Sequence, residues 1–349
     1  MNTVRFAILG SGSIARQHAN AIAAAPSAEL VGVWNRSREG AVAMGEEFGV
    51  PGTADLQEIL SRADVDAVTV ATPSGAHLDV IEPAAAAGKH VLCEKPLEVT
   101  TDRVRKVIEV CRKHDVLLAG VFQSRLSRNA HRIREAMQSG RFGRLVLASM
   151  QLRWYRDQAY YDSSDWRGTW SLDGGGALMN QGIHFVDLLC YLVGDPDEVQ
   201  AYAATRAHAS IEVEDTIAAT LHFPGGGLGT IEASTACAPG FPRRLEISGE
   251  HGTALLEDDR LICWKFADEQ PEDEQIRAEG LAGDQMKGGT SDPTAIDCEG
   301  HRRLIEDLAC AIREKREPII PGEEAQRAVR VIEAIYQAVR ERRSVQVAK

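Results

Sequence analysis

The sequence has no apolar run that approaches the roughly 18 residues needed for a membrane-spanning helix. It also has no excess of basic residues: the formal net charge is −12 at pH 7, which argues against nucleic acid and anionic membranes as partners. Residues 1–9 lead directly into a predicted strand, without the charged and apolar leader of a secretory signal. We therefore expect a cytoplasmic protein whose partner is a small molecule.

Paired cysteines are lacking as well. The seven cysteines are scattered, odd in number and form no C-x-x-C motif, a pattern typical of reduced thiols and not of a disulfide framework. No H-E-x-x-H or comparable ligand set occurs, so we expect no metal. Aromatic residues make up only 5% of the chain, but six of them fall within residues 154–170.

The remaining pattern predicts an α/β protein. Over residues 1–122, short apolar runs alternate with helical patterns, and the runs lack the polar alternation of half-exposed strands. Such runs are expected of parallel strands buried on both faces, in a doubly wound Rossmann sheet. The expected strands are residues 4–9, 30–34, 67–71, 90–93 and 116–122, and the expected helices are residues 14–25, 41–48, 56–60, 77–87 and 101–114.

The pattern changes after residue 122, which predicts a Rossmann domain over 1–122 and a second domain over 123–349. Helices are expected at 129–138 and up to about 193, with several longer strands between 199 and 266. This is typical of an α/β domain with a large open, mostly antiparallel sheet. We expect it to bind the substrate and to form a homodimer or homotetramer that covers the open face. Residues 268–297 are acidic and predict a surface excursion.

The first turn carries a nucleotide-binding pattern. Residues 10–15 read G-x-G-x-x-A between the first strand and the first helix. Gly10 permits the tight turn, and Gly12 lets a pyrophosphate approach the backbone N–H groups at the helix start. A glycine-rich turn without a ligand is the alternative, but strand, helix and position agree with the motif. We predict a dinucleotide site that includes Gly10, Gly12, Ser13 and Ile14.

The end of the second predicted strand bears on the choice of cofactor. Asn35 stands where an aspartate or glutamate would bind the adenosine ribose and disfavour a 2′-phosphate. Arg36, Ser37 and Arg38 offer groups that could hold a phosphate. This favours NADP, or use of both NAD and NADP, over NAD alone. The alternative is that both arginines are merely solvated.

Two further loops leave the carboxyl ends of predicted strands, where ligands bind in such sheets. The second contains the sequence Glu-Lys-Pro, and a lysine partly desolvated there could relay the proton of a substrate hydroxyl. An exposed lysine at a strand end is the more common case. The cofactor contacts predicted here and near the nicotinamide are Thr72, Pro73, His77, Glu94, Lys95 and Gln123.

Residues 174–187 read GGGALMNQGIHFVD and predict a helix that follows three glycines. Asn180 and His184 are four residues apart and so share one helix face. An imidazole titrates near neutral pH, which suits proton exchange with an alcohol. Taken alone, a buried histidine satisfied by Asp187, or a helix-capping Asn180, is the more common arrangement.

The aromatic segment has two interpretations. Trp154, Tyr161 and Trp166 could stack against a sugar, while Arg125 and Arg167 meet a carboxylate or phosphate. Alternatively, the aromatic side chains pack on the sheet or at a subunit contact.

Together these segments resemble the Gfo/Idh/MocA oxidoreductases, the family of glucose-fructose oxidoreductase and inositol dehydrogenase. The resemblance extends over nearly the whole chain and implies hydride transfer between NAD(P) and a secondary carbinol of a sugar or cyclitol. It is carried by residues 10–15, the Glu94-Lys95-Pro96 triplet, residues 174–187, and the closing segments 301–318 and 322–336.

Transferred residue by residue, the resemblance implies that Lys95 and His184 are the acid/base pair. Asn180 stands where the family usually has an aspartate, and would orient a substrate hydroxyl. Residues 160–170, 179–181 and 214–216 resemble the subset that oxidises the 3″-hydroxyl of UDP-N-acetylhexosamine or hexosaminuronate sugars, although an acidic residue is expected there at position 35. The substrate contacts predicted from the aromatic segment and from the resemblance together are Arg125, Trp154, Tyr161, Trp166, Arg167, Asn180 and His184.

Two other functions stay open from the sequence. The first is an NAD-retaining glycosidase, or a substrate-to-substrate oxidoreductase, on the same fold. The second is a non-catalytic protein that senses NAD(P), because a fold does not fix a function. The presence of both Lys95 and His184 speaks against the sensor, which needs neither.

Overall fold

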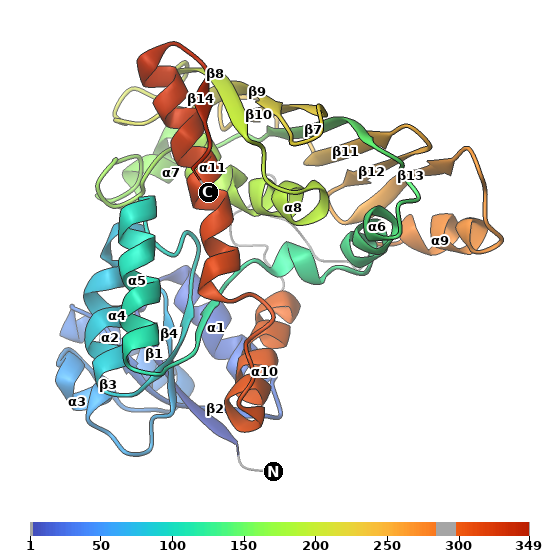
Figure 1. Cartoon of the computed structure of the whole chain (residues 1–349). Helices are drawn as coiled ribbons and strands as arrows, with labels where there is room; N and C mark the ends of the chain where they lie inside the picture. Colours follow the sequence, from blue (N-terminus) through green and yellow to red (C-terminus); the bar gives the residue numbers. More distant parts are fainter. Residues whose placement is uncertain (1–2, 284–297, 349) are drawn as a thin grey trace. The chain divides into compact units, whose positions relative to one another are not determined.

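The computed structural model describes residues 3–283 and 298–348. The chain divides into two compact units, Met1–Gln123 with Asp297–Gln326, and Ser124–Ile296 with Arg327–Lys349. The first unit thus includes α10 (Glu299–Glu314), a helix from far along the chain (Figure 1). The predicted functional division at residue 122 remains a prediction.

The first unit contains a sheet of parallel strands in the order β3-β2-β1-β4-β5-β6, as the apolar runs predicted. The order reverses between β1 and β4, and the carboxyl ends of strands flank the ligand crevice at such a reversal. The strands are β1 (Val4–Leu9), β2 (Ala28–Trp34), β3 (Gly52–Thr53), β4 (Ala67–Val70), β5 (His90–Cys93) and β6 (Leu118–Gly120).

Helices cover both faces of this sheet. Helix α1 (Ser13–Ala23) packs against α10, while α4 (His77–Ala86) packs against α5 (Thr101–Lys113), and the two pairs lie on opposite sides of the strands in Figure 1. Each begins or ends close to its predicted position. The remaining helices of this unit are α2 (Arg38–Phe48), α3 (Leu56–Leu60) and the 3₁₀ turn η1 (Ser74–Ala76).

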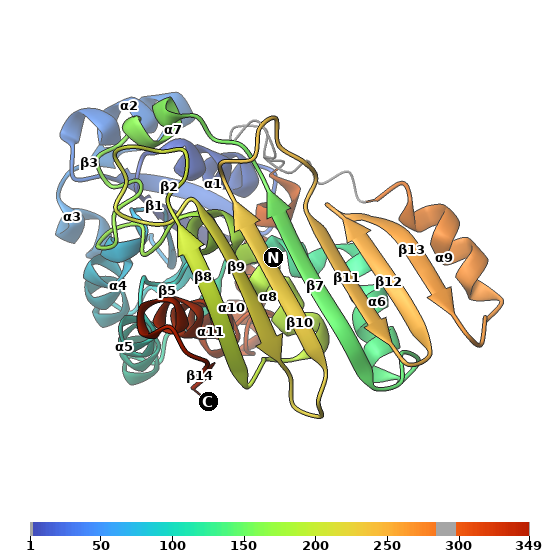
Figure 2. The same ribbon diagram turned by 90° about the horizontal axis from the view of Figure 1, so that it is seen from above.

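The second unit is built on a sheet in the order β13-β12-β11-β7-β10-β9-β8-β14, seen from above in Figure 2. Neighbours pair antiparallel, as expected, except that β10 pairs with β7 in parallel. The strands are β7 (Leu145–Arg153), β8 (Glu198–Ala204), β9 (Thr216–His222), β10 (Leu228–Ser234), β11 (Arg244–Gly249), β12 (Gly252–Glu257), β13 (Arg260–Phe266) and β14 (Val345–Gln346).

The two faces of this second sheet differ. Helix α8 (Ile183–Val193) packs on β7 and β11, and the π-helix η3 (Ala177–Gly182) packs on β9 and β10. The opposite face carries apolar side chains that stay exposed, Leu147 at 42%, Leu228 at 55% and Tyr202 at 77%. The predicted homodimer or homotetramer would cover such a face, and it remains a prediction.

Two local features differ from expectation. The helix predicted up to residue 193 opens with the wide turns of η3 before α8 begins. Within the predicted surface excursion, α9 (Glu272–Gly280) forms a helix whose buried Asp273 accepts hydrogen bonds from Trp264 Nε1 (2.6 Å) and Arg141. These hydrogen bonds to an ionised carboxylate stabilise the helix although the segment is acidic and poor in apolar residues. The rest of that prediction, residues 284–297, lies outside the described residues.

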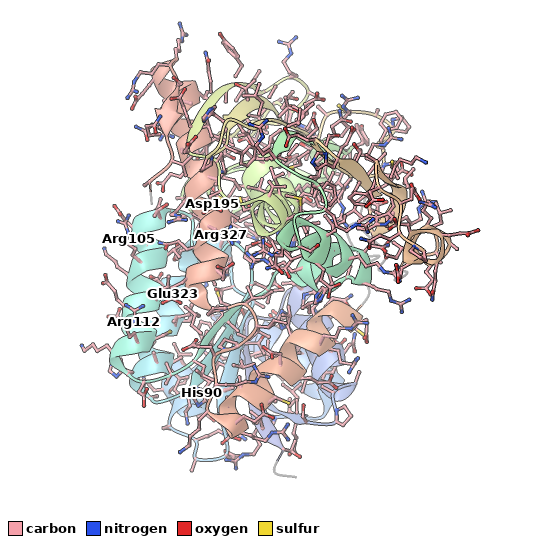
Figure 3. The ribbon with its side chains drawn as sticks, turned by 45° about the vertical axis from the view of Figure 1, so that its right-hand side comes forward. His90, Arg105, Arg112, Asp195, Glu323 and Arg327 are labelled. Atoms are coloured by element: carbon pink, nitrogen blue, oxygen red, sulfur yellow. The ribbon has the colours of Figure 1, made fainter. Side chains whose placement is uncertain are left out.

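Helix α11 (Gly322–Glu341) contributes residues to both units. In the first unit, Glu323 pairs with Arg112 of α5 at 2.6 Å. In the second, Arg327 pairs with Asp195 at 2.9 Å. Figure 3 labels both pairs. The other helices of the second unit are α6 (Arg128–Gln138) and α7 (Gln158–Asp162). The 3₁₀ turn η2 (Gln123–Leu126) lies where the chain passes from the first unit to the second.

Among residues 3–283 and 298–348, no helix combines the length and the apolar character needed to cross a bilayer.

Candidate active site

The glycine turn after β1 has the geometry that its motif predicts. Gly10 has φ of +130°, and a Cβ there would lie 2.5 Å from the carbonyl oxygen of Ala71, so only glycine fits. Gly12 precedes the first residue of α1, and a Cβ at Gly12 would meet nothing within 4 Å. The start of α1 is therefore open to a ligand, and helix N-termini favour anionic groups such as a pyrophosphate.

Two buried oxygen atoms near the carboxyl ends of the strands also fit a bound ligand. Within the described part of the chain, Thr72 Oγ1 and Gln123 Oε1 are buried and have no hydrogen-bond partner. A buried polar atom without a partner is unfavourable, so a ligand that donates hydrogen bonds would stabilise both. Thr72 follows β4 and Gln123 follows β6. Both residues are among the predicted cofactor contacts.

The end of β2 presents the residues predicted to select the cofactor. Asn35 is half-buried, and its Nδ2 donates to the carbonyl of Ser37 at 3.3 Å. Ser37 caps α2, because its Oγ accepts from the Gly40 N–H at 3.2 Å. Arg36 and Arg38 are exposed. The arrangement leaves an uncharged amide and two solvated arginines at the place where an adenosine ribose is expected to bind.

His77 joins the two predicted cofactor loops. Its Nε2 lies 3.0 Å from the carbonyl oxygen of Thr72, and its Nδ1 lies 2.9 Å from that of Pro96. The ring is buried, and this burial lowers its pKa. His77 therefore holds the loops in place, and its predicted direct contact with a cofactor remains a prediction.

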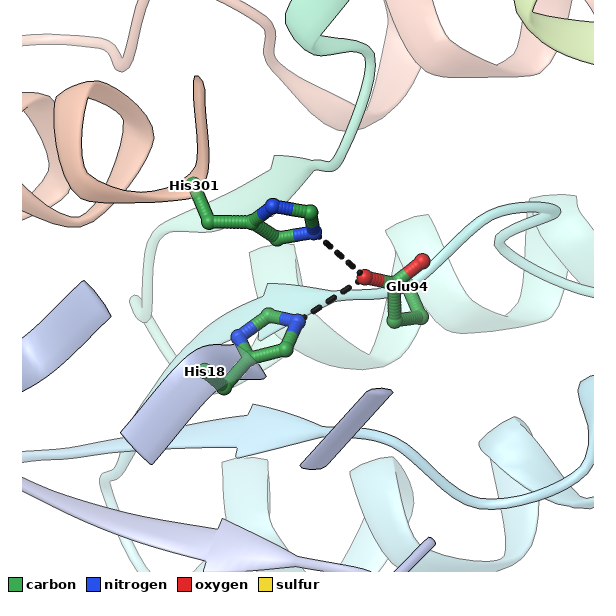
Figure 4. Close-up of side chains that lie close together, drawn as sticks. All are labelled: His18, Glu94 and His301. Carbon is green, nitrogen blue, oxygen red and sulfur yellow. Dashed lines mark hydrogen bonds and ion pairs between the residues drawn. The ribbon is translucent and has the colours of Figure 1, made fainter. Parts of the chain in front are cut away.

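Glu94 lies in a buried cluster with two histidines that sequence reasoning missed (Figure 4). His18 Nε2 and His301 Nε2 lie 2.8 and 3.1 Å from Glu94 Oε1. The Thr69 hydroxyl lies 2.9 Å from His18 Nδ1, so a neutral His18 can accept there and donate to Glu94. Burial opposes ionisation of Glu94, but hydrogen bonds from His18 and His301 outweigh it and hold its pKa well below its usual range. The only sequence signal for this cluster was a histidine, His18, that closely follows the G-x-G-x-x-A motif.

This cluster brings together three possible metal ligands, whose donor atoms lie within 4.8 Å of one another. The short contacts between them are ordinary hydrogen-bond distances, and both imidazoles share one carboxylate oxygen. The cluster joins α1, the end of β5 and α10. Because Glu94 Oε2 also accepts the backbone N–H of Lys95 at 3.1 Å, it fixes the backbone at Lys95, whose side chain is half-buried.

Glu94→Gln is expected to lower the stability of the protein at pH 7, by about 1–3 kcal/mol, because an amide has one acceptor oxygen and adds buried donors. A carboxyl group whose pKa is lowered by folding contributes stability that is fully present above its unfolded pKa, near 4.5 for Glu94, and that is lost as the pH falls toward its folded pKa. The difference between wild type and variant should therefore shrink as the pH falls below 4.5. Urea midpoints across this pH range test the prediction, with the exposed Glu109→Gln as control. A difference that does not change with pH would contradict it.

In the second unit, Asn180 lies in η3 and His184 in the first turn of α8, and both are half-buried. Glu214 holds the start of η3, because its carboxylate accepts from the N–H groups of Gly176 (3.0 Å) and Leu178 (2.9 Å). The Tyr336 hydroxyl donates to the same carboxylate at 2.9 Å. Burial raises the pKa of Glu214 to about 7.

Arg125, a predicted substrate contact, lies in a buried ion pair. Its Nε and Nη2 each lie 2.7 Å from an oxygen of Asp187, and its guanidinium also covers the Tyr191 ring at 5.0 Å. Asp187 is thus a partner of Arg125. A role for Arg125 in substrate binding remains a prediction.

The side chains of the aromatic segment fall into two groups, one that packs in the interior and one that stays partly exposed. Trp154 and Tyr161 are buried, and the Tyr161 hydroxyl bonds Thr235 Oγ1 at 2.8 Å, as packing on the sheet predicts. Trp166 and Arg167 are half-buried. The Arg167 guanidinium lies 4.2 Å from the ring centroid of Tyr160 and 4.9 Å from that of Trp166. This aromatic and cationic cluster has the chemistry of a site for a sugar with anionic groups.

The strand order and the glycine turn define a Rossmann fold of the dinucleotide-binding kind. Residues 4–122 match the model of the oxidoreductase family with an NAD-binding Rossmann fold, and residues 130–255 match the GFO/IDH/MocA C-terminal domain. The chain belongs to the GFO/IDH/MocA family of oxidoreductases, as its motifs predicted.

Individual relatives cover the full chain. The WlbA dehydrogenase of Bordetella pertussis, solved with NADH and UDP-GlcNAcA, is 32% identical with a TM-score of 0.89, covering 100% of this chain and 99% of that one. The WlbA enzyme of Chromobacterium violaceum, solved with the same two ligands, is 32% identical with a TM-score of 0.88, covering 100% and 97%. Inositol 2-dehydrogenase of Rhizobium meliloti is 27% identical, over 99% of this chain and 100% of its own length.

Proposed function

We propose that this protein is an NAD(P)-dependent dehydrogenase that oxidises a secondary ring hydroxyl of an acidic nucleotide sugar of the UDP-GlcNAcA kind. The observation that carries the proposal is the full-length similarity, at 32% identity, to two enzymes solved with NADH and UDP-GlcNAcA. The relative named for inositol oxidation is less similar, at 27%. The cluster of Tyr160, Trp166 and Arg167 supports an anionic sugar, because it offers aromatic faces beside a guanidinium.

The residues of the first unit would hold the cofactor. The open start of α1 at Gly12 suits the pyrophosphate, and the buried oxygens of Thr72 and Gln123 suit groups that donate hydrogen bonds. When bound, the nicotinamide accepts the hydride that the carbinol carbon loses. Oxidation also releases the hydroxyl proton, and leaves a ketone.

We propose that Lys95 and His184 serve as the acid/base pair that handles this proton. Both side chains are half-buried, Lys95 at the carboxyl end of β5 and His184 in the first turn of α8. An amine Nζ or an imidazole nitrogen can each accept the proton during oxidation and return it during reduction. The buried cluster around Glu94 supports this role, because it tethers the Lys95 backbone.

We propose that the enzyme accepts both NAD and NADP, because Asn35 is uncharged and Arg36 and Arg38 are exposed beside it. Asn35→Asp is expected to lower kcat/KM for NADP relative to NAD by about tenfold or more, since a carboxylate repels the 2′-phosphate. Initial rates with each cofactor measure this ratio. Asn35→Ser, which adds no charge, is the matched control and should preserve it. An unchanged ratio in Asn35→Asp would contradict the assignment.

The proposal is tested by the substrate range of the purified protein. After fluorescence titration with NADH and NADPH, rates are compared for UDP-GlcNAcA, UDP-sugars without a carboxylate, myo-inositol and free monosaccharides. We expect the highest kcat/KM for UDP-GlcNAcA. A preference for myo-inositol or a free sugar would contradict the substrate class, and binding of neither nucleotide would contradict the dehydrogenase function.

A further inference from the structure

Asn180 has a carboxylate neighbour within its own unit. Asp173, directly before the three glycines, is only 2% exposed. Its Oδ2 accepts the Gly168 N–H at 2.9 Å, and its Oδ1 accepts a hydrogen bond from Asn180 Nδ2. An aspartate buried in this way is stabilised only by such donors.

The contact with Asp173 determines the orientation of the Asn180 amide, that is, whether its NH₂ group or its Oδ1 atom faces Asp173. A carboxylate only accepts hydrogen bonds, so the NH₂ group of Asn180 must be the end that faces Asp173. The Oδ1 atom is consequently directed to the other side, where it accepts from Gln181 Nε2 at 3.2 Å. A carbonyl oxygen has two lone pairs, and Asn180 is itself half-buried.

A chain of side-chain hydrogen bonds then continues to the aromatic and cationic cluster. Gln181 Nε2 also donates to the Tyr160 hydroxyl at 2.7 Å, and Arg167 lies over the Tyr160 ring. The orientation of Asn180 is thus linked, through Gln181, to the residues that suit an anionic sugar.

We infer that Asp173 is a positioning residue, which turns the Asn180 amide so that Oδ1 is the hydrogen-bond acceptor for the substrate hydroxyl. The inference rests on the proposed function, in which Asn180 orients that hydroxyl. Because Asp173 orients the Asn180 amide, its uncharged Oδ1 atom can accept the hydrogen bond that an aspartate at position 180 would accept. Because the charge is on Asp173 and not on residue 180, the group that accepts from the substrate is itself uncharged. This lessens the repulsion that a carboxylate at position 180 would exert on an anionic sugar, which makes this pair a determinant of specificity for acidic substrates.

The alternative is that Asp173 only stabilises the loop, through its hydrogen bond with Gly168. Variants that exchange the side chains of residues 173 and 180 distinguish this structural role from the positioning of Asn180. Asn180→Asp alone places two carboxylates in contact, which disfavours the ionisation of both. Its kcat/KM for UDP-GlcNAcA at pH 7 should fall by about tenfold or more, and should recover as the pH is lowered and one carboxyl becomes protonated.

The double variant Asp173→Asn with Asn180→Asp restores one amide and one carboxylate in contact. The new amide at position 173 can donate to the new carboxylate at position 180, so the acceptor is again oriented. We expect the double variant to regain kcat relative to Asn180→Asp, and to lose the recovery at low pH. Because it carries the charge at position 180, its KM for UDP-GlcNAcA should stay above that of wild type, whereas its KM for an uncharged sugar nucleoside should not.

Asp268→Asn makes the same chemical change at an exposed position of the same unit, outside residues 160–170, and should leave rates unchanged. Melting temperatures of all variants identify any loss of folding. A double variant no more active than Asn180→Asp, although folded, would overturn the inference, as would Asp173→Asn with the kcat and pH profile of wild type. If wild type neither binds UDP-GlcNAcA in calorimetry nor oxidises it, the proposed function fails and the inference with it. If wild type is active and only the rescue fails, the inference alone fails.

Discussion

Lys95→Met is expected to lower kcat for oxidation of the nucleotide sugar by about 10²–10⁴-fold, the range that a positioned proton acceptor contributes. Methionine preserves much of the length and apolar stem of the side chain but cannot exchange a proton. The affinity for NADH should change little, because the open start of α1 and the tethered backbone at residue 95 remain. Single-turnover absorbance of the reduced nicotinamide measures the rate, and fluorescence titration measures the affinity.

A matched control is Lys106→Met on α5, where the side chain is exposed. This variant should keep the kcat of wild type. A Lys95→Met enzyme with a kcat within a few-fold of wild type would exclude Lys95 as an acid/base group. Loss of NADH binding together with kcat would instead assign Lys95 to cofactor binding.

The largest expected effect on stability is at the ion pair of the second unit. Asp187→Asn should lower the free energy of unfolding by about 3–5 kcal/mol, because removal of one partner leaves the buried charge of Arg125 uncompensated. Urea unfolding followed by tryptophan fluorescence suits this measurement, since four of the five tryptophans (Trp154, Trp166, Trp170 and Trp264) lie in the second unit.

Two comparisons test the physical reason for that loss. The double variant Arg125→Met with Asp187→Leu removes both charges and should recover most of the stability, because the buried pair itself is worth little. Glu250→Gln breaks the exposed pair with Arg144 and should cost less than about 1 kcal/mol. If Asp187→Asn is as stable as wild type, the claim that the buried charge of Arg125 requires Asp187 is contradicted.

The Rossmann unit was predictable because its signals are local. Buried parallel strands are short and apolar, and the glycine turn joins β1 to α1 within a few residues. The predicted strand at residues 4–9 and the helix starting at residue 77 appear at those positions. The motifs also identified the family correctly.

The features that the sequence did not reveal depend on contacts between distant residues. His301 reaches Glu94 from a helix about two hundred positions away, and no local pattern shows that they meet. The parallel pairing of β10 with β7 and the Arg125–Asp187 pair are likewise long-range. The π-helix at Asn180 depends on the distant Glu214, which accepts hydrogen bonds at its start. The acidic composition of α9 concealed the buried hydrogen bonds of Asp273.

The most direct test of the proposed function is one incubation of the purified protein with NAD and UDP-GlcNAcA, in which reduced nicotinamide is followed by absorbance and the sugar by mass spectrometry. We predict that reduced nicotinamide forms together with a sugar product two hydrogens lighter, and that both form at least about 100-fold more slowly with Lys95→Met. If wild type binds NAD but leaves UDP-GlcNAcA unchanged and forms no reduced nicotinamide, the proposed function is contradicted.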